Sequence, residues 1–159
     1  MFMQIYVTTG IGEGPTPLAA FDAALIDAGV PNYNLLYLSS VIPANCVVRR
    51  ARYVAQSDEY GFRLYIVMAR QEEQRQGKSA WAGLGWTQEQ NCGRGLFVEI
   101  HGWERGQVER DIRMTLESMI DNRPLSYGPI ETEIVGIECR GKPVCALAIA
   151  VYQSDGWKK

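Results

Sequence analysis

The sequence has little of what several common classes of protein require. It contains four cysteines and a single histidine, and no two cysteines form a C-x-x-C pair, so we expect no metal site. No apolar run reaches the roughly 18 residues of a membrane-spanning helix. The amino terminus lacks the basic stretch that opens a signal peptide. We therefore expect a cytoplasmic protein with free thiols and no membrane association.

The sequence also lacks an excess of basic residues. Sixteen Lys and Arg stand against 18 Asp and Glu, a net charge of −2, and the pI is about 5.5. A general nucleic-acid binder would show a basic patch or a high pI, so we expect no nucleic-acid partner. The 159 residues, 47% hydrophobic and 21% charged, are typical of one soluble domain with a substantial core, which we assign to 1–159.

Hydrophobic periodicity predicts two helices among a larger number of strands. The first helix has Thr16 as its N-cap, Pro17 at its first position and Gly29 just past its end. Gly83 and Gly85 inside one strand indicate that another element approaches closely. We expect an α+β sandwich of antiparallel or mixed sheets covered by helices. The helices are predicted over 17–28 and 104–121, and the strands over 2–9, 34–42, 61–69, 80–87, 95–101, 131–138 and 143–152.

Asp22 interrupts the apolar face of the first helix, which Leu18, Phe21 and Leu25 define. It can be an aspartate at the edge of that stripe, paired with an arginine. It can also be a buried carboxylate that binds a cation, because buried charges need partners. The pattern alone favours the first interpretation.

Glu99 lies inside an apolar strand, on the same side as Phe97 and His101. If that side faces water, Glu99 is an ordinary surface residue. If it faces a pocket, burial would raise the pKa of Glu99, as a general acid requires. His101 at the strand end is given no catalytic role.

Ser39 and Ser40 lie in an apolar stretch that ends at Pro43. By themselves they indicate only small hydroxyl residues near a strand end, before a turn. The longer run that contains them is more specific. Its segments are Gly12–Leu25 (GEGPTPLAAFDAAL), Ala28–Gly29, Asn32–Leu35 (NYNL) and Leu38–Pro43 (LSSVIP), and a further segment is Gly95–Glu99 (GLFVE). In order and spacing these segments resemble pyruvoyl-dependent arginine decarboxylases. The chain departs from the family pattern at Pro31, where glycine is common, and at His101, where some members have an acidic residue.

This resemblance implies a four-layer αββα sandwich of mostly antiparallel or mixed sheets flanked by helices. It implies a homotrimer of αβ units with active sites between neighbouring protomers, or a hexamer of two trimers. It also implies a zymogen that cleaves itself between Ser39 and Ser40. The products would be a β chain of residues 1–39 and an α chain of residues 40–159.

The resemblance also implies a role for each matched site residue. The Ser40 hydroxyl would attack the Ser39 carbonyl, and Ser40 would become the covalent pyruvoyl cofactor. Asn34 would assist by a hydrogen bond to the developing oxyanion. The pyruvoyl carbonyl would form a Schiff base with the amino group of a small-molecule amino acid. Glu99 would protonate the carbanion left by carbon dioxide, and Asp22 would bind the guanidinium of the substrate.

The implied activity is that of a carbon–carbon lyase, which converts L-arginine to agmatine and carbon dioxide in polyamine biosynthesis or acid consumption. Two alternatives stay open. The first is the same chemistry on lysine, ornithine or histidine, which a substrate panel would reveal. The second is a non-processed, non-catalytic relative that binds a small molecule or serves as a scaffold, which an uncleaved intact mass would reveal.

Overall fold

The first helix lies where the sequence predicts it. In the computed structural model, which describes residues 1–158, α1 runs from Pro17 to Ala28. The backbone N–H of Ala19 donates to the Thr16 hydroxyl at 3.1 Å, and Gly29 ends the helix with a φ of 87°. A Cβ atom on Gly29 would lie 1.9 Å from the carbonyl oxygen of Tyr53. Glycine is therefore needed there for both its conformation and its size.

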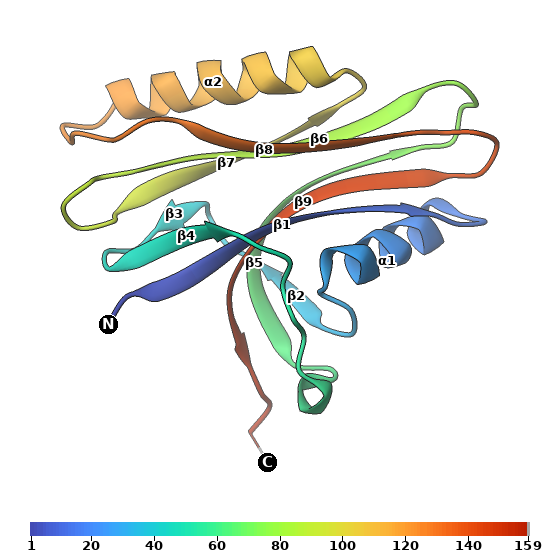
Figure 1. The fold of residues 1–159 in the computed structure, drawn as a ribbon, viewed down its shortest axis with the longest axis horizontal. Helices are drawn as coiled ribbons and strands as arrows, with labels where there is room; N and C mark the ends of the chain where they lie inside the picture. Colours follow the sequence, from blue (N-terminus) through green and yellow to red (C-terminus); the bar gives the residue numbers. More distant parts are fainter. Residues whose placement is uncertain (159) are drawn as a thin grey trace.

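Two sheets lie face to face (Figure 1). The first has the order β2-β5-β9-β1-β4 and the second the order β3-β7-β6-β8. β1 pairs with β4 in parallel and β2 with β5 in parallel, whereas the remaining pairs among residues 1–158 are antiparallel. The strands are β1 (Met3–Glu13), β2 (Asn34–Tyr37), β3 (Val41–Ile42), β4 (Cys46–Arg50), β5 (Arg63–Glu73), β6 (Ser79–Gln88), β7 (Gly95–Gly102), β8 (Glu131–Glu138) and β9 (Val144–Asp155).

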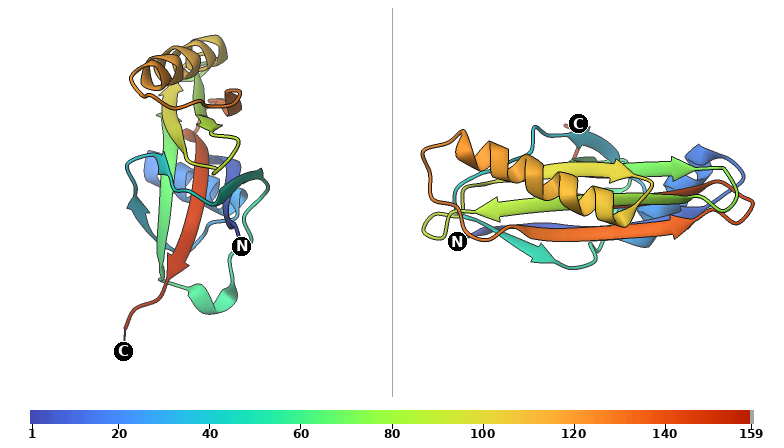
Figure 2. Two further views of the ribbon diagram at one scale, coloured as in Figure 1. Left: turned by 90° about the vertical axis from the view of Figure 1, so that its left-hand side faces the viewer. Right: turned by 90° about the horizontal axis from the view of Figure 1, so that it is seen from above.

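The two helices cover the outer faces of the two sheets, which gives four layers (Figures 1 and 2). α1 packs on β1 and β9, and α2 (Arg105–Asp121) packs on β6 and β7. One apolar core lies between the sheets around Phe97, a second under α1 around Ala24, and a third under α2 around Ile112. The α+β sandwich that the sequence predicts is confirmed. Among the helices of residues 1–158, none has the length and apolar character needed to cross a membrane.

Gly83 and Gly85 mark a close approach, as predicted, and the element that approaches is α2. A Cβ atom on Gly85 would lie 2.2 Å from Cγ2 of the buried Ile112. Gly85→Ala is therefore expected to displace α2 and lower the free energy of unfolding by about 1–3 kcal/mol, measured by urea denaturation. Gly106→Ala is the control, because the new Cβ would approach only the flexible Arg110 side chain. An unchanged urea midpoint in Gly85→Ala would contradict tight packing of α2.

The prediction of one strand over 34–42 is wrong. β2 ends at Tyr37 in the first sheet, and β3 begins at Val41 in the second. The chain leaves one sheet and enters the other at residues 38–40, and the apolar residues on both sides hide this break in the sequence. β4 and the short 3₁₀ helix η1 (Ser57–Glu59) were not predicted. Cys139 and Cys145 are free thiols, as the sequence predicts, and both are buried.

Candidate active site

The peptide bond between Ser39 and Ser40 lies where the chain crosses from one sheet to the other. On one side, the Leu38 N–H donates to the Ile66 carbonyl of β5 at 2.8 Å. On the other side, the Ser40 carbonyl accepts from the Phe97 N–H of β7 at 2.8 Å. The segment is therefore fixed at both ends, once to each sheet, and Figure 1 shows this passage from β2 to β3.

Ser40 has an unusual backbone conformation. Its φ is 65°, in the left-handed region that residues with a side chain rarely adopt. The other non-glycine residues with positive φ in residues 1–158 are Asn32 and Asn45, and asparagine is among the residues that tolerate it best. Such a conformation costs on the order of 1–3 kcal/mol and persists only where the surroundings hold it. Here the hydrogen bonds to both sheets hold it, so the candidate cleavage site carries strain.

The side chain of Ser40 contacts Glu99. The Ser40 hydroxyl donates a short hydrogen bond to Oε1 of Glu99, which lies in the middle of β7. Glu99 is on the same strand face as Phe97, which is buried between the sheets, and Glu99 itself is half-buried. Burial raises the pKa of the Glu99 carboxyl, and the hydrogen bond from Ser40 opposes this in part. The structure thus brings Ser40 together with a carboxyl group suited to hold a proton.

Tyr152 is a site residue that the sequence did not reveal. It lies in β9 of the first sheet, and its hydroxyl donates to the Val41 carbonyl in β3 at 2.9 Å. Its ring packs against Phe97, with the ring centres 6.1 Å apart. Burial raises the pKa of Tyr152, with a smaller contribution from the nearby Glu99, so the phenol stays neutral. An aromatic residue in an otherwise apolar strand gives no sequence signal for this contact.

His101 lies two residues after Glu99 and is exposed. Its Nδ1 lies 2.7 Å from Oε1 of Gln71 in β5, so it bridges the two sheets beside the site.

Asn34 is not brought to the Ser39–Ser40 bond within one chain. Its side-chain amide donates to the Gly61 carbonyl at 2.8 Å, at the start of β2. β2 extends about 10 Å from there, and Ser39 lies beyond its far end. The role of Asn34 in cleavage stays a prediction.

Asp22 is also separate from Ser40 in the single chain. It is exposed on α1, which covers the outer face of the first sheet, whereas Glu99 faces the space between the sheets. Within residues 1–158 it forms no salt bridge, so neither an arginine partner nor a buried carboxylate is found in the isolated chain. It borders a hollow of 520 Å³ with Leu18, Phe21 and Leu25.

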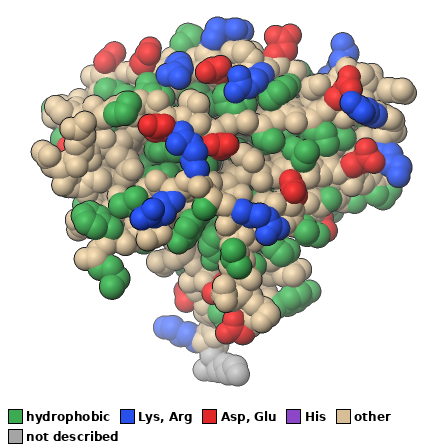
Figure 3. Space-filling view, viewed as in Figure 1, with side chains coloured by type: hydrophobic (Ala, Val, Ile, Leu, Met, Phe, Trp, Pro, Cys, Tyr) green, Lys and Arg blue, Asp and Glu red, His purple; other side chains and the backbone are tan. Residues whose placement is uncertain are grey.

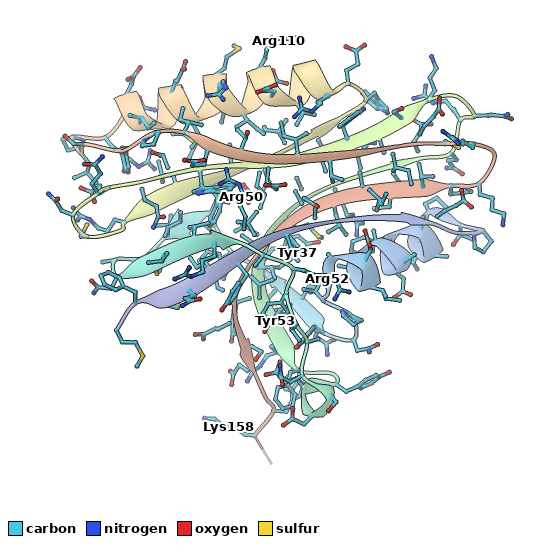
Figure 4. The ribbon with its side chains drawn as sticks, viewed as in Figure 1. Tyr37, Arg50, Arg52, Tyr53, Arg110 and Lys158 are labelled. Carbon is cyan, nitrogen blue, oxygen red and sulfur yellow. The ribbon has the colours of Figure 1, made fainter. Side chains whose placement is uncertain are left out.

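Apolar side chains lie exposed beside Ser40 and beside Asp22. Tyr37, labelled in Figure 4, comes just before the crossing and is 60% exposed, and Val41, just after it, is 57% exposed. Leu18, beside Asp22, is 73% exposed. On the face in Figure 3, charged side chains are concentrated over α2, and hydrophobic ones lie between scattered charges below. Large exposed apolar residues grouped around polar site residues are typical of contact surfaces.

The chain is similar to proteins of one known family. A family model described as pyruvoyl-dependent arginine decarboxylase matches residues 4–155. The chain is similar to the pyruvoyl-dependent arginine decarboxylases of Thermococcus kodakarensis, at 31% identity over 93% of each chain, and of Pyrococcus abyssi, at 32% over 87% of each. The relative from Halobacterium salinarum is 41% identical, and that match spans 60% of this chain and 59% of the relative. The chain therefore belongs to the pyruvoyl-dependent arginine decarboxylase family.

Proposed function

We propose that this cytoplasmic chain cuts its own backbone between Ser39 and Ser40 and then converts L-arginine to agmatine and carbon dioxide. The observation that carries the proposal is the Ser40 site, where a strained serine is fixed between two sheets with its hydroxyl on Glu99. The names of the relatives support arginine as the substrate. Agmatine formation would serve polyamine synthesis or consume acid.

Cleavage begins with the Ser40 hydroxyl. Its Oγ attacks the Ser39 carbonyl carbon, the peptide C–N bond breaks, and the hydroxyl proton ends on the Ser40 nitrogen, which leaves an ester. Loss of the Cα proton of residue 40 then expels the Ser39 carboxylate and gives dehydroalanine. Water hydrolyses this to a pyruvoyl group and ammonia. The ester relieves the strain of the left-handed backbone, and the hydrogen bond to Glu99 orients Oγ until the hydroxyl proton leaves.

Decarboxylation then takes place beside the same carboxyl group. A pyruvoyl group supplies an electron sink for the carbon–carbon bond that breaks. Position 40 fits this group, because Glu99 already lies within hydrogen-bond reach of the Ser40 side chain. Its raised pKa keeps the Glu99 proton in place at a higher pH than an ordinary glutamate would. Glu99 delivers this proton to the α-carbon of the substrate after carbon dioxide leaves.

A second copy of the chain is proposed to complete the site. Asp22 and Asn34 lie away from Ser40 in one chain, and exposed apolar side chains flank both Ser40 and Asp22. We propose a homotrimer of αβ units in which Asp22 and Asn34 of one copy face Ser40 of the next, with pairing of trimers into a hexamer as the alternative.

The role of Asp22 can be tested by removing its charge. Asp22→Asn is expected to raise KM for arginine by about 10–100-fold, because a hydrogen bond to a charged group is lost, and to leave self-cleavage unchanged. Steady-state agmatine production measures the first effect and intact mass the second. Asp121→Asn, which changes an exposed aspartate at the end of α2, is the matched control. An unchanged KM would remove Asp22 from substrate binding.

The same variant tests whether sites form between copies. Asp22→Asn and Glu99→Gln chains are each expected to be poorly active alone. When equal amounts of the two variants assemble at random into trimers, about a quarter of the interfaces have a native Asp22 on one side and a native Glu99 on the other. The activity of the mixture should therefore recover to about a quarter of the wild-type activity. Absence of recovery would place both residues in one chain. Sedimentation analysis of the wild type checks for the trimer itself.

The proposed function requires that the chain cleaves itself between Ser39 and Ser40 and that the cleaved protein forms agmatine. Intact mass of the wild type should give fragments 1–39 and 40–159, and purified protein should release agmatine from arginine. A persistently uncleaved chain would favour the scaffold alternative. Release of carbon dioxide from lysine, ornithine or histidine in preference to arginine would favour the substrate alternative.

A further inference from the structure

The Ser40–Val41 segment is held from both sheets. On the side of the second sheet, β7 supplies the Phe97 N–H to the Ser40 carbonyl and the Glu99 carboxylate to the Ser40 hydroxyl. On the side of the first sheet, Tyr152 of β9 donates its hydroxyl to the Val41 carbonyl at 2.9 Å. Tyr152 is only 8% exposed, and its ring also packs against Phe97. The contact from Tyr152 is therefore part of a rigid interior.

β3 by itself is a weak anchor. It has two residues, lies at the edge of the second sheet, and pairs only through Val41 with Leu96 and Ile42 with Gly95. The Val41 side chain is exposed, so it adds little packing. A buried tyrosine hydroxyl requires a polar partner, and its partner here is the carbonyl that directly follows Ser40. Because the residues around Ser40 must hold a left-handed backbone, this extra anchor lies where it has most effect.

We propose that Tyr152 is a positioning residue for self-cleavage, which holds the Val41 carbonyl so that the Ser40 backbone keeps the conformation from which Oγ reaches the Ser39 carbonyl carbon. This inference rests on the self-cleavage proposed above. In that step the Oγ–C bond forms, the C–N bond breaks, and the proton moves from Oγ to the Ser40 nitrogen. Tyr152 exchanges no proton in it; the buried phenol acts only as a hydrogen-bond donor.

The test is Tyr152→Phe, which keeps the ring against Phe97 and removes only the hydroxyl. The half-time of conversion of freshly made precursor to fragments 1–39 and 40–159, followed by mass spectrometry, should lengthen on the order of tenfold. Tyr65→Phe is the matched control, because Tyr65 also packs against the core between the sheets. Its half-time should equal that of the wild type. A wild-type half-time in Tyr152→Phe would overturn the proposal.

Two further measurements separate positioning from lost stability. Gly85→Ala is destabilised through the packing of α2, on the face of the second sheet opposite to Glu99, so its normal cleavage rate would show that instability alone does not slow the reaction. Hydroxylamine cuts the ester that forms in the first step and so releases fragment 1–39. In Tyr152→Phe, the rate of this release should fall by the same factor as the rate of spontaneous cleavage. Equal hydroxylamine release in Tyr152→Phe and wild type would place the effect after the first step and contradict the proposal.

Cleavage leaves the Val41 carbonyl, which accepts from Tyr152, in the α chain. We expect Tyr152→Phe to lower kcat per titrated pyruvoyl group severalfold, on the scale of one hydrogen bond, with KM for arginine unchanged. A raised KM with a native kcat would contradict positioning. If the wild type itself is not cleaved, the proposed function is wrong. If the wild type is cleaved and Tyr152→Phe is cleaved with the same half-time, only the proposed role of Tyr152 is wrong.

Discussion

Ser40→Ala is expected to remain a single uncleaved chain and to produce no agmatine. The substitution removes the Oγ that attacks the Ser39 carbonyl. Without attack there is no ester, and without the ester the chain cannot form a pyruvoyl group. The loss is complete rather than partial, because the same atom starts both the processing and the catalysis. Intact mass after prolonged incubation measures it.

The fold of Ser40→Ala should survive. Alanine can take the left-handed conformation at a cost similar to that of serine, and the hydrogen bond from Phe97 to the residue 40 carbonyl is kept. Glu99 loses the Ser40 hydroxyl, and because it is only half-buried it can hold a proton or contact water instead. Ser118→Ala on the exposed face of α2 serves as the control and should be cleaved as usual. Fragments 1–39 and 40–159 from Ser40→Ala would exclude Ser40 as the nucleophile.

Features that depend on neighbouring residues were predictable from the sequence. The bounds of α1 follow from Thr16, Pro17 and Gly29, whose effects extend over a single helical turn. The common face of Phe97 and Glu99 follows from the two-residue period of a strand. Each of these signals is complete within a few positions, so no knowledge of the rest of the fold was needed.

Features that depend on distant residues were not predictable. The break after Tyr37 exists because Leu38 bonds to Ile66 in one sheet and Ser40 bonds to Phe97 in the other. β4 exists because Cys46–Arg50 pairs with β1, a partner some 40 residues away. The contact of Tyr152 with Val41 joins positions 111 residues apart. Asp22 is exposed because α1 buries its alanine face, whereas Leu18 beside Asp22 stays exposed.

Glu99→Gln is expected to cleave itself and yet lose turnover by about 10²–10⁴-fold, the usual contribution of a positioned general acid. The glutamine carbonyl can still accept the hydrogen bond of the Ser40 hydroxyl, so the geometry for attack is preserved. The amide cannot donate a proton to the α-carbon of the substrate. Intact mass and kcat per pyruvoyl group therefore separate the two roles. Glu117→Gln, at an exposed glutamate of α2, is a control for the charge change.

The pH dependence gives this prediction a second, independent readout. A general acid works only while protonated, so kcat should fall as pH rises through the pKa of Glu99. Burial raises that pKa, and the opposing hydrogen bond from the Ser40 hydroxyl disappears when Ser40 is consumed. The pKa should therefore lie higher in the processed enzyme than in the precursor, and kcat should persist to a higher pH than an exposed glutamate would allow. In Glu99→Gln, the fall of kcat with rising pH should be absent. A residual activity in Glu99→Gln that falls at the same pH as the wild type would assign the titration, and the proton, to another group.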